Sequence, residues 1–169
     1  MKILAFSVIF VYLFMSSCSL FRTSGQSEKS KEKIAINLRE EYEPGKTIKI
    51  QVKNNSSDTL FIYDPMRPRF EKRGENKWNK VRTRYCPCGA SCPPPPEKQL
   101  LVPDGEFIIQ WDQYEEWCGE KNEKGIPETI RERVGSGLYR VKIMYYTTDS
   151  KKLNTINEQF TILEKTEER

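Results

Sequence analysis

Short stretches in which apolar and polar residues alternate constrain this chain more than any other feature of its sequence. Ile48, Ile50 and Val52 alternate with polar residues, and the same period recurs over residues 138–146. A period of two places successive side chains on opposite faces of a β-strand. Turn-forming stretches such as residues 54–58 separate these runs. The pattern therefore predicts strands that are joined by turns.

The rest of the chain favours the same fold class. Residues 70–73 and 78–82 flank a glycine-containing turn and predict a hairpin. Residues 113–133 are charged and read as irregular, with a weak indication of a short helical turn at residues 128–133. No long helical pattern separates the other runs. We therefore expect an all-β, immunoglobulin-like antiparallel β-sandwich of about seven strands.

The N-terminus has the features of an export signal. Lys2 precedes an apolar run from Ile3 to Phe14, which is shorter than the roughly 20 residues that span a bilayer but suits a signal sequence. Small residues then precede Cys18, an order that resembles the lipobox of bacterial lipoproteins. A plain cleaved signal and an N-terminal anchor helix are the alternatives. We expect Cys18 to carry lipid such as palmitate and to hold the chain at a membrane of the bacterial cell envelope, facing the periplasm or the surface.

This interpretation divides the chain into four parts. Residues 1–17 are the predicted lipoprotein signal peptide. Residues 18–32 are the lipidated cysteine and a flexible tether, because they contain too few apolar side chains to form a core. Residues 33–164 are the predicted sandwich domain, and residues 165–169 are a disordered polar tail.

Four further cysteines lie in and after a proline-rich segment. Cys86, Cys88 and Cys92 are close together, and Cys118 follows downstream. An even number of cysteines in an exported chain favours disulfides. A Cys86–Cys88 bond would close a very small strained ring, so Cys118 is expected to pair with either of these two. We favour Cys86–Cys118 with Cys88–Cys92, because Cys86 ends a predicted strand. The sandwich is thus expected to carry a disulfide-stapled, proline-rich loop.

Two other interpretations of the cysteines fit the sequence less well. The four sulfurs would suit a metal, but their spacing departs from the usual Cys-x-x-Cys knuckle. The same missing motif argues against a thiol oxidoreductase. The run of prolines is expected to be extended and to act as a stiff spacer or to dock on a partner. The candidate binding loop consists of Pro87, Gly89, Pro93, Pro94, Pro95 and Pro96.

The composition narrows the function classes. The sequence has no histidine, which excludes Ser-His-Asp and Cys-His sites and histidine-ligated metals. The net charge is +4, with both signs spread along the sequence, whereas nucleic-acid binding needs clustered basic residues. We therefore expect no catalytic residue, no metal, no cofactor and no nucleic-acid partner.

Several turns and aromatic residues occur in a recognisable order. They are residues 52–56, Gly74 with Trp78, residues 101–106 leading to Trp111, and residues 137–141. This order resembles the intracellular proteinase inhibitor (BsuPI-type) domain family from roughly Ile34 to Leu163. The resemblance implies an immunoglobulin-like sandwich and, more remotely, protease inhibition through an exposed loop. The export signal and the cysteine-rich insertion depart from that family.

The late strand also contains a fold motif. Gly137, Tyr139 and Val141 resemble the tyrosine corner of immunoglobulin-like folds, in which the tyrosine hydroxyl bonds a nearby backbone group. An ordinary strand tyrosine is the alternative.

Taken together, these features predict a membrane-anchored lipoprotein with a non-catalytic binding or structural module and an envelope protein as its partner. Inhibition of an exported protease through the cysteine-proline loop is the alternative function, and a four-cysteine metal site is a further one.

Overall fold

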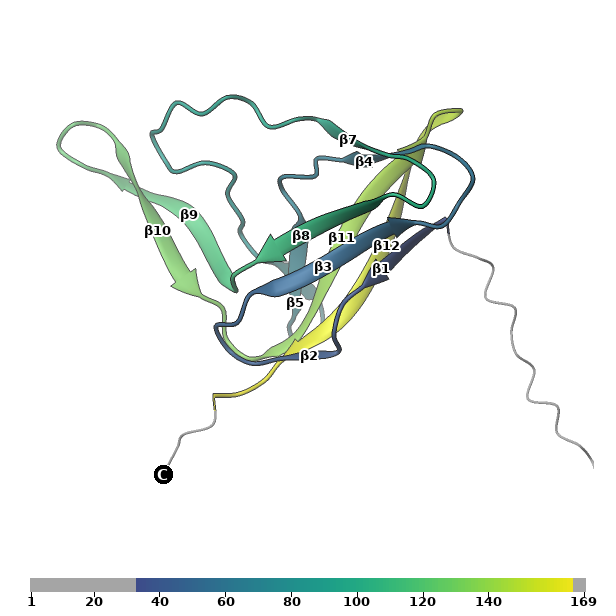
Figure 1. Ribbon diagram of the computed structural model, residues 1–169. Coiled ribbons are helices and arrows are strands. Elements are labelled where there is room, and N and C mark those ends of the chain that lie inside the picture. The colour runs from purple at the N-terminus through teal and green to yellow at the C-terminus, as the bar shows by residue number, and fades with distance from the viewer. Residues whose placement is uncertain (1–32, 166–169) are drawn as a thin grey trace, which may run out of the picture. The chain divides into compact units, whose positions relative to one another are not determined.

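The computed structural model describes residues 33–165, which form strands and no helix (Figure 1). This confirms the all-β class that the alternating pattern predicts. Within this part of the chain no helix has the length and apolarity that crossing a membrane requires. The strands are β1 (Ile34–Asn37), β2 (Glu41–Tyr42), β3 (Ile48–Asn54), β4 (Leu60–Tyr63), β5 (Arg69–Arg73), β6 (Trp78–Lys80), β7 (Lys98–Leu101), β8 (Glu106–Trp111), β9 (Tyr114–Lys121), β10 (Pro127–Arg133), β11 (Gly137–Thr147) and β12 (Ser150–Ile162).

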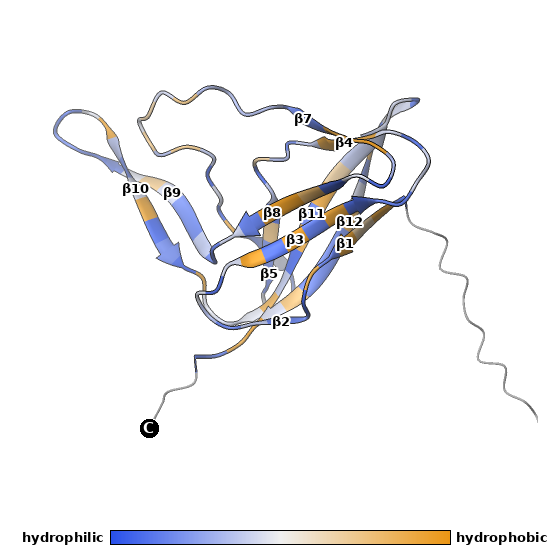
Figure 2. Cartoon of the chain, viewed as in Figure 1, coloured by the Kyte–Doolittle hydropathy of each residue, from blue (hydrophilic) through white to orange (hydrophobic). Residues whose placement is uncertain are grey.

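The strands form two larger sheets and a separate hairpin. The three-stranded sheet has the order β1-β3-β8, and the seven-stranded sheet has the order β2-β12-β11-β4-β7, with β5 joined to β11 and β6. Strands β9 and β10 pair only with each other. Ile48, Ile50 and Val52 are fully buried, and Figure 2 shows the alternation of apolar and polar residues along β3. The predicted period of two therefore marks the inner face of this sheet.

An aromatic cluster joins the two sheets. Trp111, on the three-stranded sheet, stacks on Phe70 of the seven-stranded sheet with ring centroids 4.2 Å apart. Its ring also lies 5.8 Å from that of Tyr139 and 6.3 Å from that of Phe160. Aromatic rings bury large apolar areas and add favourable ring contacts. The two sheets therefore face each other across a shared core, which makes the fold a sandwich.

The strand order is that of an immunoglobulin-like domain. Strands β1, β3 and β8 occupy the places of strands A, B and E, and β11 and β12 those of F and G. Strands β4 and β5 together form strand C, because they pair with successive parts of β11, residues 144–147 and 139–142. Residues 64–68 interrupt this strand. The immunoglobulin-like sandwich that the sequence predicts is confirmed.

The neighbouring strand is interrupted in the same way. Strand β6 pairs with β5 and β7 pairs with β4, so the chain leaves this sheet after Lys80 and returns to it at Lys98. Residues 81–97 carry the cysteine-proline segment. The β9–β10 hairpin follows β8 and precedes β11, in the connection between strands E and F. These insertions and interruptions raise the strand count to twelve, above the expected seven or so.

The hairpin corrects the prediction of an irregular segment at residues 113–133. Glu116 lies opposite Arg131, and Trp117 lies opposite Ile130, so cross-strand pairs stabilise a ladder that carries little apolar alternation. The side-chain oxygen of Asn122 accepts the N–H groups of Lys124 and Ile126 and closes the turn. The short helical turn expected at residues 128–133 is therefore wrong, because these residues form strand β10.

Candidate functional site

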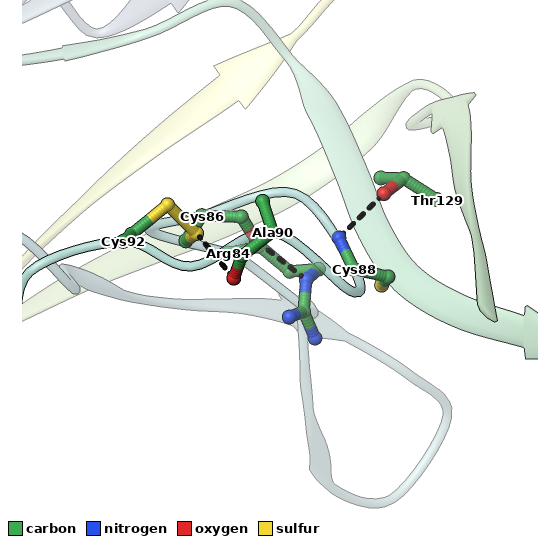
Figure 3. Close-up of a disulfide and its surroundings, with 6 residues drawn as sticks. All are labelled: Arg84, Cys86, Cys88, Ala90, Cys92 and Thr129. Carbon is green, nitrogen blue, oxygen red and sulfur yellow. Dashed lines mark hydrogen bonds between the residues drawn. A yellow bond between two sulfur atoms is a disulfide. The ribbon is translucent and has the colours of Figure 1, made fainter. Parts of the chain in front are cut away.

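Two disulfides join the four cysteines of the described residues. Cys86 pairs with Cys92, and Cys88 pairs with Cys118, with Cα atoms 6.2 and 5.6 Å apart. The two disulfides predicted from the even cysteine count are confirmed. The favoured pairing of Cys86 with Cys118 is wrong, and the structure has the other pairing that the sequence left open. Figure 3 shows the Cys86–Cys92 bond and its surroundings.

The contacts of Cys88 explain this pairing. Its N–H donates to the hydroxyl of Thr129 on β10, with an N–O distance of 2.7 Å. Thr129 lies directly opposite Cys118 in the hairpin ladder, so this hydrogen bond brings the Cys88 side chain to that of Cys118. Cys88 is buried, whereas Cys92 is exposed. Sequence spacing alone contains none of this information, because the contact depends on the hairpin.

The Cys86–Cys92 bond closes a small ring around a turn. The N–H of Ala90 donates to the carbonyl of Pro87 at 3.3 Å, and Gly89 has a φ of +72°. A turn with positive φ at its third residue favours glycine. A side chain at Gly89 would also collide with Ile126 of the hairpin. Gly89 thus allows the ring to lie directly against the β9–β10 turn.

Arg82 holds the base of the loop against the hairpin. Its guanidinium lies 3.5 Å from the ring centroid of Trp117, and its Nε donates to the carboxylate of Glu115 at 3.0 Å. Its carbonyl accepts the N–H of Glu116 at 2.8 Å. Residues 82–97 and 112–133 are therefore joined by two kinds of cross-link, covalent and polar. We call these two segments together the cysteine lobe.

The opposite side of the hairpin is charged. Arg131 pairs with Asp112 and, at 3.1 Å, with the carboxylate of Glu116. The ring of Tyr114 lies between two guanidinium groups, with that of Arg131 at 4.0 Å and that of Arg133 at 4.8 Å. Asp112, Arg131 and Arg133 are exposed, and Tyr114 and Glu116 are half-buried, so these ion pairs contribute little to the stability of the fold.

Gln113 joins the lobe to the sandwich, a role that the sequence pattern does not predict. It is fully buried. Its amide nitrogen donates to the carbonyls of Glu43 and Lys46, both at 2.8 Å, and its amide oxygen accepts the N–H of Gly45 at 2.7 Å. Its own carbonyl accepts the N–H of Val134, where the hairpin ends. A glutamine in a charged stretch gives no sequence signal of such a role.

Two clefts flank the base of the hairpin. One has a volume of about 160 Å³ and is lined by residues that include Arg84, Gln110 and Tyr114. The other has a volume of about 180 Å³ and is lined by residues that include Lys72 and Arg133. Both are smaller than the roughly 300 Å³ at which pockets for small ligands begin. Each has room for no more than one or two side chains.

The residues of the candidate binding loop lie on the surface. Pro87, Gly89, Pro93, Pro94 and Pro96 are exposed, and Pro95 is half-buried. The prolines form no strand and lead from the ring to β7. The carbonyl of Glu97, just after them, accepts the N–H of Asp64 at 2.7 Å. The structure thus brings Pro87 and Gly89 together with the cysteines, while the proline run lies between the ring and the sheet.

The residues of the predicted fold motif lie at the start of β11. The hydroxyl of Tyr139 donates to the carbonyl of Gly135 at 2.5 Å, and Val141 is fully buried. Gly137 has a φ of +136°, a conformation that favours glycine. Burial of the phenol, and secondly the nearby charge of Glu115, raise the pKa of Tyr139 well above its ordinary value. Tyr139 thus fixes the point where the chain re-enters the sandwich after the hairpin.

Two further predictions concern the lipid anchor and a metal site. Cys18 and the signal and tether segments lie outside the described residues. Among residues 33–165 no cluster of three or more cysteine and acidic side chains is arranged to hold a metal ion. The four sulfurs of the cysteine lobe are paired, so a four-thiolate metal site would require both disulfides to be reduced.

The comparisons with solved structures give distant matches. No protein-family model and no curated protein sequence matches this chain. The ASH / PapD-like domain of human CEP192 (PapD-like domain 7) is similar at 15% identity and a TM-score of 0.34, over 79% of this chain and 87% of that chain. A β-glucosidase from Listeria innocua, solved with gluconolactone, is similar at 13% identity and a TM-score of 0.29, over 76% of this chain and 15% of that chain.

Proposed function

We propose that this protein is a lipid-anchored protein of the bacterial cell envelope, and that its sandwich presents the cysteine lobe as a rigid, non-catalytic binding surface for an envelope protein. One observation carries the proposal: both disulfides lie in segments that project from the sandwich and outside its hydrophobic core. The core residues come from the two large sheets and from Val81. The cross-links therefore order a surface.

Ordering a surface in advance favours binding. A flexible loop loses conformational freedom when a partner immobilises it, and cross-links reduce that cost. In the cysteine lobe, the turn of the ring is held by Cys88 and its N–H bond to Thr129, while Arg82 holds the base. Pro87, Gly89, Ala90 and Ser91 remain exposed. These exposed groups on a fixed backbone are the contact surface that we propose.

Two features support an envelope location. Paired cysteines are typical of oxidising compartments outside the cytoplasm. The apolar N-terminal run that ends near Cys18 resembles a lipoprotein signal.

The resemblance of the turn and aromatic order to the BsuPI-type inhibitor family agrees with a non-catalytic module. The cysteine-rich insertion, which forms part of the cysteine lobe, departs from that family, so we assign the lobe the function specific to this chain.

Cross-linking in the native host tests the binding surface. A photoreactive amino acid at Ser91 is expected to give a discrete protein adduct, whereas the same group at Lys49, exposed on the outer face of β3, gives none. Replacing Cys88 and Cys118 by alanine frees the ring from the hairpin and is expected to abolish the adduct, with circular dichroism confirming that the sandwich is folded. Absence of an adduct at Ser91, or equal adducts at both positions, would count against the proposal.

The anchor has its own test. Growth with labelled palmitate is expected to label the wild-type protein and not the Cys18→Ala variant, which is expected to leave the membrane fraction. An unlabelled wild-type protein would contradict the anchor and leave the proposed binding surface untouched.

The ring also supplies a second candidate function. Gly89, Ala90 and Ser91 are exposed within a disulfide-closed loop, a geometry that suits the reactive loop of a protease inhibitor. Inhibition assays against exported proteases of the host would test it. If replacing these three residues leaves inhibition unchanged, the loop is not the reactive site.

A further inference from the structure

The outer face of the seven-stranded sheet gathers positive charge that is dispersed in the sequence. Cross-strand register places Lys142 beside Arg69 and Arg140 beside Glu71, and Glu71 beside Lys80. Buried residues alternate with these positions along β11. We call this surface the cationic face; its basic residues are Arg69, Arg73, Lys80, Lys98, Arg140 and Lys142, and its acidic residues are Glu41 and Glu71.

Few of these charges are neutralised within the protein. Glu71 is shared by Arg140 at 2.5 Å and Lys142 at 3.6 Å. The other basic residues of the cationic face form no ion pair with a carboxylate of residues 33–165. They are also exposed. A group of exposed cations on one face of a sheet attracts an anionic surface.

Aromatic and aliphatic side chains adjoin Lys98 at one end of the cationic face. Phe61 stacks on Tyr146 with ring centroids 5.2 Å apart, and the amine of Lys98 lies 4.9 Å from the centroid of the Phe61 ring. Leu100 lies opposite Phe61 and is 50% exposed. Aromatic rings and basic residues together are the groups that proteins place at a membrane–water interface. This combination favours a lipid surface over a purely ionic partner.

The chain enters the domain at the same end. Lys33 pairs with Asp58 at 2.9 Å, just before β4 begins at Leu60. Leu60 lies opposite Leu101 and Thr147, so this end also carries Phe61, Leu100 and Tyr146. A tether of roughly 15 residues from Cys18 reaches at most about 50 Å. If Cys18 carries lipid, as proposed above, this end of the sandwich is the one held near the bilayer.

We infer that the cationic face is a docking surface for anionic phospholipid, which lays the sandwich on the membrane that holds its anchor. The inference uses the proposed anchor only to say which end of the sandwich lies near the bilayer. The attraction itself comes from residues of the sandwich and acts without the lipid.

Vesicle binding by the chain from Ser19 onward tests the inference, because the whole sandwich core lies within residues 34–162. Sedimentation with phosphatidylcholine vesicles containing about a third phosphatidylglycerol is expected to show binding that weakens with salt, and pure phosphatidylcholine vesicles are expected to bind far less. Arg69→Glu with Lys80→Glu is expected to weaken partitioning by about thirtyfold, since each basic residue near such a surface contributes about fivefold.

A matched charge reversal provides the control. Lys49→Glu with Lys53→Glu changes the net charge equally on the outer face of the other sheet and is expected to have little effect. Leu100→Ser is expected to weaken binding. Ile108→Ser, which changes a similarly exposed residue on the outer face of β8, is expected not to weaken it. Equal loss in both charge variants, no preference for anionic vesicles, or binding to heparin without binding to vesicles would overturn the inference. Palmitate labelling of Cys18 reports on the anchor separately, so either proposal can fail alone.

Discussion

At the scale of single residues, buried polar side chains hold two turns of the sandwich, one at each end of β3. Gln113 satisfies three backbone groups of the turn between β2 and β3. Asn54 does the same at the opposite end of β3, where its amide donates to the carbonyls of Asp58 and Leu101 and accepts the N–H of Ser56. The turn after Asn54 could be predicted from its local residues, whereas the partners of Gln113 are about 70 residues away and could not.

Gln113→Ala is expected to lower the free energy of unfolding by about 2–4 kcal/mol, because it leaves backbone groups without their partners. Urea denaturation measures the change. Gln99→Ala is the control, because Gln99 is exposed, and it is expected to change stability by less than about 0.5 kcal/mol. Equal effects of the two substitutions would contradict the role of Gln113.

Tyr139→Phe is expected to cost about 1 kcal/mol at neutral pH, since it removes the bond to Gly135 while keeping the ring contacts. The raised pKa of Tyr139 adds a dependence on pH. The unfolded chain ionises this phenol from about pH 10, whereas the folded chain keeps it protonated. The contribution of Tyr139 to stability is therefore complete below about pH 10 and declines above it. Denaturation at pH 8 and pH 11 is expected to show a smaller difference between wild type and variant at the higher pH; a constant difference would refute this.

At the scale of elements, the two disulfides enclose segments of different length. Cys86 and Cys92 are 6 residues apart, and Cys88 and Cys118 are 30 apart. The presence of disulfides could be predicted from the cysteine count, but their pairing depends on Thr129 and the β9–β10 hairpin. That hairpin was missed because glutamate, lysine and arginine occupy both of its faces. The β5–β6 hairpin was found because glycine marks its turn and Phe70 marks its buried face.

Removing each disulfide in turn is expected to give unequal losses of stability. In the chain-entropy model, replacing Cys88 and Cys118 by alanine costs about 3–4 kcal/mol, and replacing Cys86 and Cys92 costs about 2 kcal/mol. Guanidinium denaturation of the two double variants measures both. The reverse order would show that strain or residual structure outweighs loop length.

At the scale of the whole molecule, the sandwich and the cysteine lobe differ in how they are stabilised. The sandwich has a continuous core around Trp111, and the period-two pattern of β3 and β11 predicted it because burial on one face dictates that pattern. The lobe is held by cross-links and surface contacts such as that between Arg82 and Trp117. Such contacts depend on tertiary neighbours, so the sequence contained little information about them.

Hydrogen exchange of the native protein is expected to separate these two parts. Amides of β3 and β11 are expected to exchange only through global unfolding, whereas those of β9 and β10 exchange through local opening at lower free energy. Mass spectrometry of proteolytic fragments measures the difference. Equal protection throughout would mean that the hairpin unfolds only together with the core.

The connectivity of the disulfides has a consequence for biosynthesis. The first cysteine of the cluster pairs with the third, and the second with the fourth, so the two bonds interleave along the chain. An oxidase that acts on the chain from its N-terminus reaches Cys92 while both Cys86 and Cys88 are still reduced. Cys118 arrives later. A bond between Cys88 and Cys92 at that moment traps the wrong isomer. A chain that forms this early bond reaches the native pairing only if a disulfide isomerase or another thiol breaks the bond again, whereas a chain whose hairpin forms before oxidation avoids it.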